Sequence, residues 1–178
     1  MTELQALETS TDLIDTFQEQ WDASHPECHF HCVPAVTRLM RMAAYAERAA
    51  GEELARFSLT RGEAEVLFAI VRNPQLDITP KRLQQLMLIS SGGLTSRLDR
   101  LEKKGLLVRL PDPNDRRGTV LKATQEGEAV TLAAHKAHTE REAKIIEVLS
   151  ADEKAELARL LKKLINAQEG ALVPEGLK

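Results

Sequence analysis

Three features that would place a chain in a definite class are scarce in these 178 residues. Only two cysteines occur, which is too few for the disulfide framework of a small secreted protein and agrees with a reducing compartment. Aromatic residues make up only 3%, with a single tryptophan, a composition that does not favour a sandwich or a barrel. Apolar runs are far shorter than the roughly 20 residues that cross a bilayer, and the acidic N-terminus lacks a signal-peptide layout. We therefore expect a cytoplasmic protein with no membrane partner.

Helix-forming residues dominate what remains. Leucine, alanine, glutamate, lysine and arginine are abundant, and 43% hydrophobic residues are enough for a core. Helical spacing of apolar residues covers 11–23, 34–57, 60–72, 79–89, 91–104, 124–149 and a last stretch from 150. Two short β-compatible runs, 106–110 and 119–123, flank a turn rich in proline, aspartate and glycine. The sequence predicts a mainly α fold with one small β-hairpin.

Several helix boundaries can be read from capping residues. Thr60 followed by Glu63, and Ser150 followed by Glu153, have the form of capping boxes. Thr124 is a predicted N-cap, and Gly105 is a predicted C-terminal stop for helix 91–104. The two last helices lack obvious core partners in their own chain, so we expect them at an interface between subunits.

Charge is segregated along the chain, although its formal net value is only −3. Residues 1–29 hold seven acids and no lysine or arginine, whereas residues 79–118 hold nine basic and four acidic residues. A basic central block of this kind is typical of nucleic-acid binding. The alternative is a solvated basic helix face beside an ordinary charged turn.

Helix 91–104 carries the basic block in a form that suits a DNA groove. Leu94, Leu98 and Leu101 form its inner stripe, and the opposite face presents small residues and arginines. Such a face can enter the major groove, while the arginines of the following hairpin tip can reach the minor groove. Asp115 can orient one of these arginines. The predicted DNA-binding residues are Ser90, Ser91, Gly92, Thr95, Ser96, Arg97, Arg100, Asp115, Arg116 and Arg117.

The stretch from Ser90 to Leu106, followed by Pro113-Asn114-Asp115-Arg116-Arg117-Gly118 and Thr124-Gln125-Glu126-Gly127, closely resembles the core of the MarR family of regulators. Roughly residues 34–168 fit the family layout. The resemblance implies a winged helix-turn-helix homodimer on palindromic DNA, with an extra N-terminal helix in this chain. Ala123 departs from the leucine usual in the family. The expected divisions are 1–57, an acidic arm and dimerisation helices; 58–124, the DNA-binding domain; and 125–178, C-terminal dimerisation helices.

A narrower resemblance connects the chain to the urate-responsive, PecS-like branch of this family. Trp21, Glu65, Arg97 and Arg109 stand at the places of that branch's ligand residues, although the branch has aspartate where this chain has Glu65. The resemblance implies a planar anionic ligand, aromatic or purine-like, that stacks on the indole and pairs with arginine. The alternative is that Trp21 only anchors its helix and Glu65 makes a local ion pair.

A cluster of histidine and cysteine lies between His25 and Cys32. Its residues Cys28, His29, His31 and Cys32 could hold zinc or copper, or the cysteines could respond to oxidation. The spacing matches no established zinc pattern, so the alternative is a loop in which both cysteines are simply small buried residues.

These observations favour a transcription regulator over an enzyme. The sequence has no nucleophile elbow, no phosphate-binding glycine loop and no His-Glu-x-x-His motif. We expect a nucleoid-associated repressor, relieved by a small-molecule effector and needing no cofactor. The alternatives are a metal- or thiol-responsive regulator and a module that uses the hairpin for protein contacts.

Overall fold

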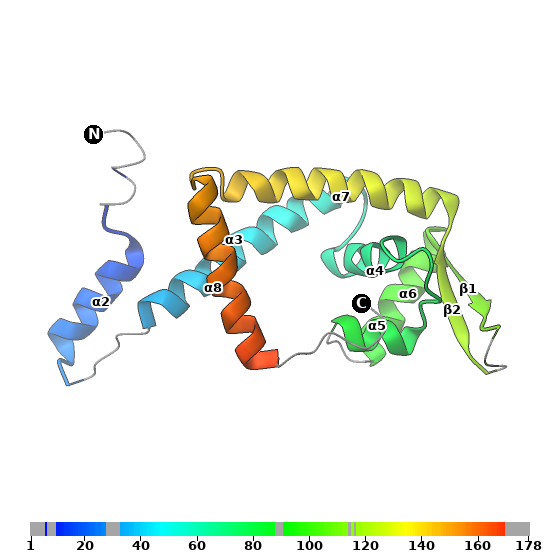
Figure 1. Ribbon diagram of the computed structural model, residues 1–178, viewed down its shortest axis with the longest axis horizontal. Helices are drawn as coiled ribbons and strands as arrows, with labels where there is room; N and C mark the ends of the chain where they lie inside the picture. The colour runs from blue at the N-terminus through cyan, green and yellow to red at the C-terminus, as the bar shows by residue number, and fades with distance from the viewer. Residues whose placement is uncertain are drawn as a thin grey trace. The chain divides into compact units, whose positions relative to one another are not determined.

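The computed structural model describes residues 6, 10–27, 33–87, 91–113, 115 and 117–169. Within these ranges the chain forms seven helices and one antiparallel two-stranded hairpin (Figure 1). The elements are α2 (Leu13–Ser24), α3 (Val33–Ala55), α4 (Arg61–Val71), α5 (Pro80–Met87), α6 (Ser91–Lys103), β1 (Leu107–Pro111), β2 (Thr119–Ala123), α7 (Gln125–Ile145) and α8 (Ala151–Glu169). The predicted mainly α fold with a small hairpin and an extra N-terminal helix is confirmed.

The chain divides into two compact units, Met1–Ala49 and Ala50–Lys178, and helix α3 contains the boundary. In the first unit Asp12 caps α2, because its side chain accepts hydrogen bonds from the backbone of Ile14 and Asp15 at 2.7 and 3.1 Å. Arg38 on α3 donates from Nε to the same carboxylate at 2.8 Å. The hydrogen bond from Arg38 is the main cause that lowers the pKa of Asp12 to about 2. This ion pair connects α2 to α3.

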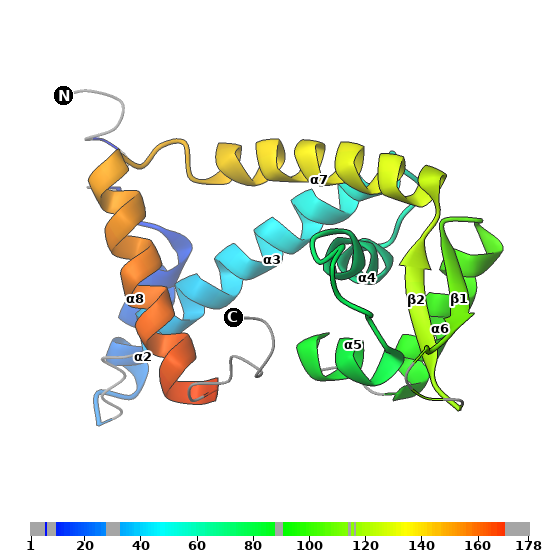
Figure 2. The same cartoon turned by 45° about the vertical axis from the view of Figure 1, so that its right-hand side comes forward.

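Helix α4 is the centre of the core in the second unit. Ala64, Val66 and Leu67 are fully buried, and α7 lies beside α4 in both views (Figures 1 and 2). Helix α7 therefore has a core partner in its own chain, contrary to the expectation from the sequence. Helices α5 and α6 pack on α4 as well, through Leu83 and the apolar stripe of α6. The core therefore fixes the orientation of α6 from its inner side, which leaves the outer side of that helix available for another role.

Helix boundaries follow the capping residues in most places. The box of Thr60 and Glu63 opens α4, and Thr124 caps α7. Helix α7 ends at Ile145, although the apolar pattern predicted an end near residue 149. The backbone leaves helical geometry at Ile146, and Leu149 donates to the carbonyl of Ile146 at 3.1 Å in the turn that precedes the capping box of α8.

The hairpin is held at both ends. Leu107 pairs with Ala123 at its base, and Pro111 pairs with Thr119 near its tip. Leu121 also donates to the carbonyl of Ile78 at 2.8 Å, which ties the segment before α5 to the hairpin. These bonds join the two strands to each other and fix β2 to the segment before α5.

The junction between α6, the hairpin and α7 is very close packed. Gly105 has a φ of 72°, a conformation that glycine adopts at little cost, and it ends α6. The Thr124 hydroxyl donates to the Gly105 carbonyl at 2.7 Å and accepts from the Gly127 backbone at 2.9 Å. A Cβ atom on Gly127 would lie 1.9 Å from the Leu106 carbonyl oxygen, so only glycine fits there.

None of the described helices combines the length and the apolar content that a membrane span requires.

Candidate nucleic-acid interface

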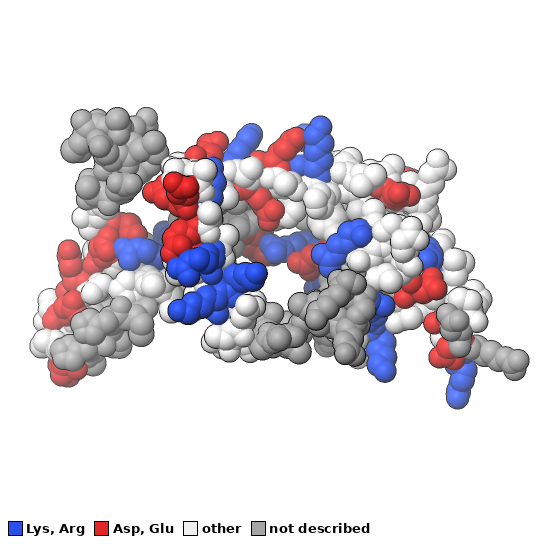
Figure 3. All heavy atoms as spheres, viewed as in Figure 1, with Lys and Arg blue, Asp and Glu red and all other residues white. Residues whose placement is uncertain are grey.

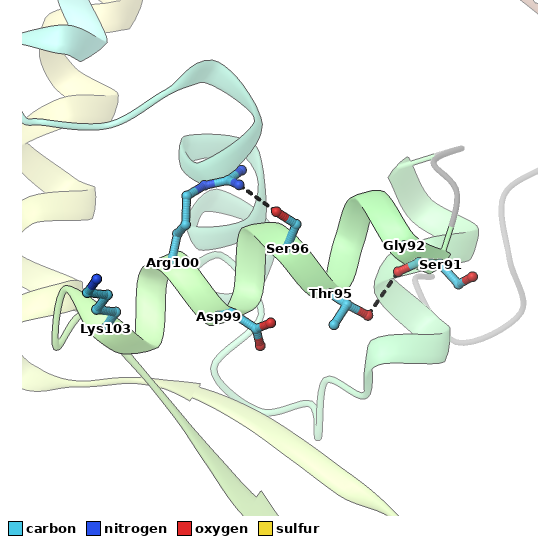
Figure 4. Close-up of a pocket in the computed structure, with 7 residues that line it drawn as sticks. All are labelled: Ser91, Gly92, Thr95, Ser96, Asp99, Arg100 and Lys103. Carbon is cyan, nitrogen blue, oxygen red and sulfur yellow. Dashed lines mark hydrogen bonds between the residues drawn. The ribbon is translucent and has the colours of Figure 1, made fainter.

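Helix α6 has one buried face and one open face. Leu94, Leu98 and Leu101 are buried as predicted, with Leu101 fully inaccessible. The opposite face forms a shallow groove (Figure 4). Its lining consists of Ser91, Gly92, Thr95, Ser96, Asp99, Arg100 and Lys103. The structure therefore brings together five of the predicted DNA-binding residues and adds Asp99 and Lys103 to them.

Hydrogen bonds order the side chains of this groove. Thr95 donates from its hydroxyl to the Ser91 carbonyl at 3.0 Å, and Arg100 donates from Nη1 to the Ser96 hydroxyl at 2.6 Å. Arg100 and Ser96 project from one side of the helix, whereas Thr95 and Asp99 project from the other (Figure 4). Ser90, which precedes the helix, lies outside the described residues.

Arg100 also reaches a buried carboxylate at the start of α4. Its Nε donates to Glu63 Oε1 at 3.0 Å, and Lys104 donates from Nζ to Glu63 Oε2 at 2.8 Å. The Thr60 backbone donates to the same Oε2 at 2.8 Å. Burial alone would raise the pKa of Glu63, but the hydrogen bonds from Lys104, Thr60 and Arg100 outweigh burial and lower the pKa to about 2. Glu63 is therefore an ionised carboxylate with 0% exposure.

Arg97 lies on the side of α6 that faces α4, away from the lining of the groove. Its Nη1 is 3.6 Å from Glu65 Oε2, and this nitrogen is buried without a hydrogen-bond partner among the described residues. A Cβ atom on Gly62 would lie 2.4 Å from the Arg97 Cζ, so glycine makes room for the guanidinium. Glu65 also accepts from Arg61 Nε at 3.0 Å. Two residues of the predicted ligand set, Glu65 and Arg97, are thus neighbours.

The other two residues of the predicted ligand set have different surroundings. Arg109 on β1 pairs with Asp99 and, at 3.6 Å from its Nε, with Glu102, so its guanidinium braces the hairpin against α6. Trp21 belongs to the N-terminal unit, where its ring lies 5.3 Å from that of His25. Trp21 is 51% exposed and lines a small hollow on α2.

At the hairpin tip, Asp115 shapes the turn. Its carboxylate accepts from the Arg117 backbone at 2.9 Å, and its carbonyl accepts from the Gly118 backbone at 2.8 Å. Among the described residues Asp115 binds backbone, and its predicted role in orienting an arginine side chain stays a prediction. Arg117 is exposed at the tip. Arg116 lies outside the described residues.

The predicted metal or thiol site at Cys28, His29, His31 and Cys32 also lies outside the described residues. In the part of the chain that the structure does describe, no group of three or more histidine, cysteine, aspartate or glutamate side chains could hold a metal ion. The metal- or thiol-responsive alternative stays a prediction, and metal analysis of the purified protein tests it.

The sequence did not predict which acidic residues pair with the basic residues. On the face drawn in Figure 3, lysine and arginine side chains are interspersed with aspartate and glutamate. Arg97, Arg100 and Arg109 all have acidic partners within the chain. The position of Arg97 had a signal in the sequence, since it stands three residues after Leu94 and four before Leu101 and so shares their helix face. The partner of Arg100 had none, because Glu63 is 37 residues away.

Comparison with known proteins identifies relatives along most of the chain. A model of the MarR family matches residues 57–118. The chain is 31% identical over 158 residues to the HTH-type transcriptional regulator PecS of Dickeya dadantii, covering 86% of this chain and 95% of that protein. It is 36% identical over 120 residues to the multiple antibiotic resistance protein MarR of Escherichia coli, covering 67% and 82%.

Solved structures give the same picture. A crystal structure of a mutant E. coli MarR complexed with operator DNA matches with a TM-score of 0.65 and 29% identity, covering 87% of this chain and 99% of that one. The winged helix-turn-helix fold is therefore shared, with α5 and α6 as its helix pair and the hairpin as its wing.

Proposed function

Since the chain belongs to the MarR family of DNA-binding transcriptional regulators, which are not enzymes, we propose that it is a homodimeric repressor that binds palindromic DNA and is released by a small anionic ligand. The ligand that causes this release would be aromatic or purine-like. The protein would act in the cytoplasm on the nucleoid. The observation that carries this proposal is the open face of α6, whose small and basic side chains stand on a helix that is buried on its other side.

The chemistry of that face fits a major groove. Ser91, Gly92 and Thr95 near the start of the helix allow close approach, and backbone N–H groups there can meet phosphates. Arg100 and Lys103 supply positive charge further along. The exposed Arg117 at the hairpin tip suits the adjacent minor groove. Residues 58–124 would thus form the DNA-binding domain.

Two chains would associate through the regions that precede and follow this DNA-binding domain in the sequence. Helix α8 has no buried residue among its described side chains, and it exposes Leu157, Leu160, Leu164 and Ile165 by 40 to 55%. Figure 3 shows acidic groups at the start of this helix, where they complement the helix dipole. An apolar stripe of this size on a regular helix favours a partner surface. We assign residues 1–57 and 125–178 to dimerisation.

DNA binding is tested by selecting duplexes from a random pool with the wild-type chain and measuring their affinity by gel shift. Arg117→Ala and Arg100→Gln should weaken binding, each by about 1–3 kcal/mol if the arginine contacts a base. The matched control is Arg56→Gln, a well-exposed arginine that pairs with Glu53 of its own helix region at 2.6 Å. Binding that is indifferent to both DNA sequence and salt would contradict the proposal.

The pair of Glu65 and Arg97 supports the proposal that a ligand releases the protein from DNA. The buried Nη1 of Arg97 has no hydrogen-bond partner in the described structure, and an anion would supply one. Trp21 is the single tryptophan, so quenching of its fluorescence tests whether the ligand stacks on it as proposed. We expect quenching by urate or salicylate, a loss of DNA affinity of about 5–150-fold, and neither effect in Arg97→Gln. Unchanged DNA affinity at saturating concentrations of both anions would contradict this part of the proposal.

A further inference from the structure

Glu63 lies at the junction between the start of α4 and the open face of α6. It is completely buried, yet its two oxygens hold the side chains of Arg100 and Lys104. We propose that Glu63 is a positioning residue for DNA recognition, which orients Arg100 before DNA arrives. This inference rests on the proposed DNA binding and deepens it, since it names a residue that acts on the DNA-binding face without belonging to that face.

The geometry fixes the Arg100 guanidinium at two points. Its Nε donates to Glu63 at 3.0 Å and its Nη1 donates to Ser96 at 2.6 Å, so both the position and the plane of the group are set. A guanidinium has more N–H donors than these two bonds use, and they lie at its outer end. The Arg100 side chain is 49% exposed, so that end can reach a phosphate or a guanine.

The energetic reason is preorganisation. A free surface arginine loses rotamer freedom when it binds DNA, and this loss weakens binding. Here the bonds to Glu63 and Ser96 restrict Arg100 during folding, so little freedom remains to be lost. Lys104 is held separately by the other Glu63 oxygen and by the Ser58 carbonyl at 2.7 Å. Two cations therefore share one carboxylate, and the cluster keeps a net positive charge toward DNA.

The test is a double-mutant cycle of Glu63→Gln and Arg100→Gln, measured by gel shift on duplexes selected by the wild type. Glutamine keeps the shape of Glu63 and can retain the capping box of α4. Glu63→Gln should weaken DNA binding about 2- to 10-fold in the wild-type background, and should have no further effect once Arg100 is Gln. Glu53→Gln is the matched control, because it removes the same charge from another arginine pair.

An equal loss in both backgrounds would overturn the proposal, because Glu63 would then act through the stability of the fold. Unchanged or tighter binding by Glu63→Gln would overturn it as well, since Glu63 would then be idle or would compete with DNA for Arg100. If the wild type enriched no duplex at all, the proposed function itself would fail. If the wild type binds DNA but the effects of Glu63→Gln and Arg100→Gln are independent, the role of Glu63 is refuted and the proposed DNA binding stands.

A second measurement needs no variant of Glu63. In the nitrogen-15 NMR spectrum of the wild-type chain, the Nε–H of Arg100 should exchange slowly with water, because a buried carboxylate accepts its hydrogen bond. The signal is assigned by its absence from Arg100→Lys. Exchange as fast as that of Arg56, an exposed arginine, would overturn the proposal even if Glu63→Gln failed to fold.

Discussion

Helices α4 and α8 begin with the same local motif and then differ in almost every other respect. Thr60 with Glu63 and Ser150 with Glu153 both form capping boxes at the helix start. Yet α4 buries most of its length, whereas none of the described side chains of α8 is buried. The comparison teaches that a capping box decides where a helix begins, and that packing decides what its apolar stripe and its glutamate do.

The two glutamates show the difference most clearly. Both have a lowered pKa. For Glu153 the cause is hydrogen bonding to the backbone and hydroxyl of Ser150, its neighbour in the same box. For Glu63, Lys104, which directly follows α6, and Arg100 of α6 add their hydrogen bonds to that of Thr60 and overcome the opposing effect of burial. The same residue type in the same motif is thus a local cap on α8 and a tertiary contact on α4.

The largest effect that we expect concerns the apolar stripes. Leu67→Ala on α4 should lower the free energy of unfolding by about 2–5 kcal/mol, because it leaves a cavity in a fully buried position. Leu160→Ala on α8, at a 44% exposed position, should change it by no more than about 0.5 kcal/mol in the dilute protein. Urea denaturation by circular dichroism measures both.

An equal loss of stability in both variants at low protein concentration would contradict the difference that we expect between the apolar stripes of α4 and α8. A stability loss in Leu160→Ala that appears only at higher protein concentration would support the difference, because the residue then contributes through association of chains. Sedimentation velocity of the same samples shows whether the variant is a weaker dimer.

The next effect concerns acid. The pKa of Glu63 is about 2 in the folded chain and 4.5 in its reference state, so its ionisation stabilises the fold above pH 4.5. This stability, at most about 3 kcal/mol, should be lost as the pH falls from 4.5 toward 2. Glu63→Gln should flatten that part of the profile, whereas Glu153→Gln should leave most of it in place. Urea denaturation between pH 6 and pH 3 gives the profile, and an unchanged slope in Glu63→Gln would contradict the buried ion cluster.

The smallest effect should be the same for both helices. Thr60→Ala and Ser150→Ala each remove a side-chain acceptor from a helix start, and each should cost about 1 kcal/mol. Because the bonds are local, burial of the rest of the helix should matter little. Thermal melting of the two variants checks this, and a difference of several kcal/mol between them would show that capping is not local here.

Much of the fold could be predicted because its signals are local. The starts of α4, α7 and α8 follow from Thr60, Thr124 and Ser150, and the end of α6 follows from Gly105. The open face of α6 follows from the leucine spacing alone. The end of α7 was predicted too late, because an apolar periodicity does not show where a backbone turn interrupts it.

The pairing of charges could not be predicted, because it depends on how the helices pack. Two acids of α4, Glu63 and Glu65, divide the arginines of α6 between them, and Asp99 of α6 binds Arg109 of the hairpin. Each of these pairs joins different elements. A sequence pattern shows that basic residues are abundant, but only the packed structure shows which of them already have partners.

The junction at Gly105, Thr124 and Gly127 has a mechanical consequence. The Thr124 hydroxyl joins the end of α6 to the first turn of α7, and Gly127 leaves no space between that turn and Leu106. Such a corner resists bending, so we expect the first turn of α7 and the end of α6 to move together. In the proposed dimer, a few degrees of rotation far along α7 would swing α6 as one rigid piece, and the spacing of the two reading helices would change with it.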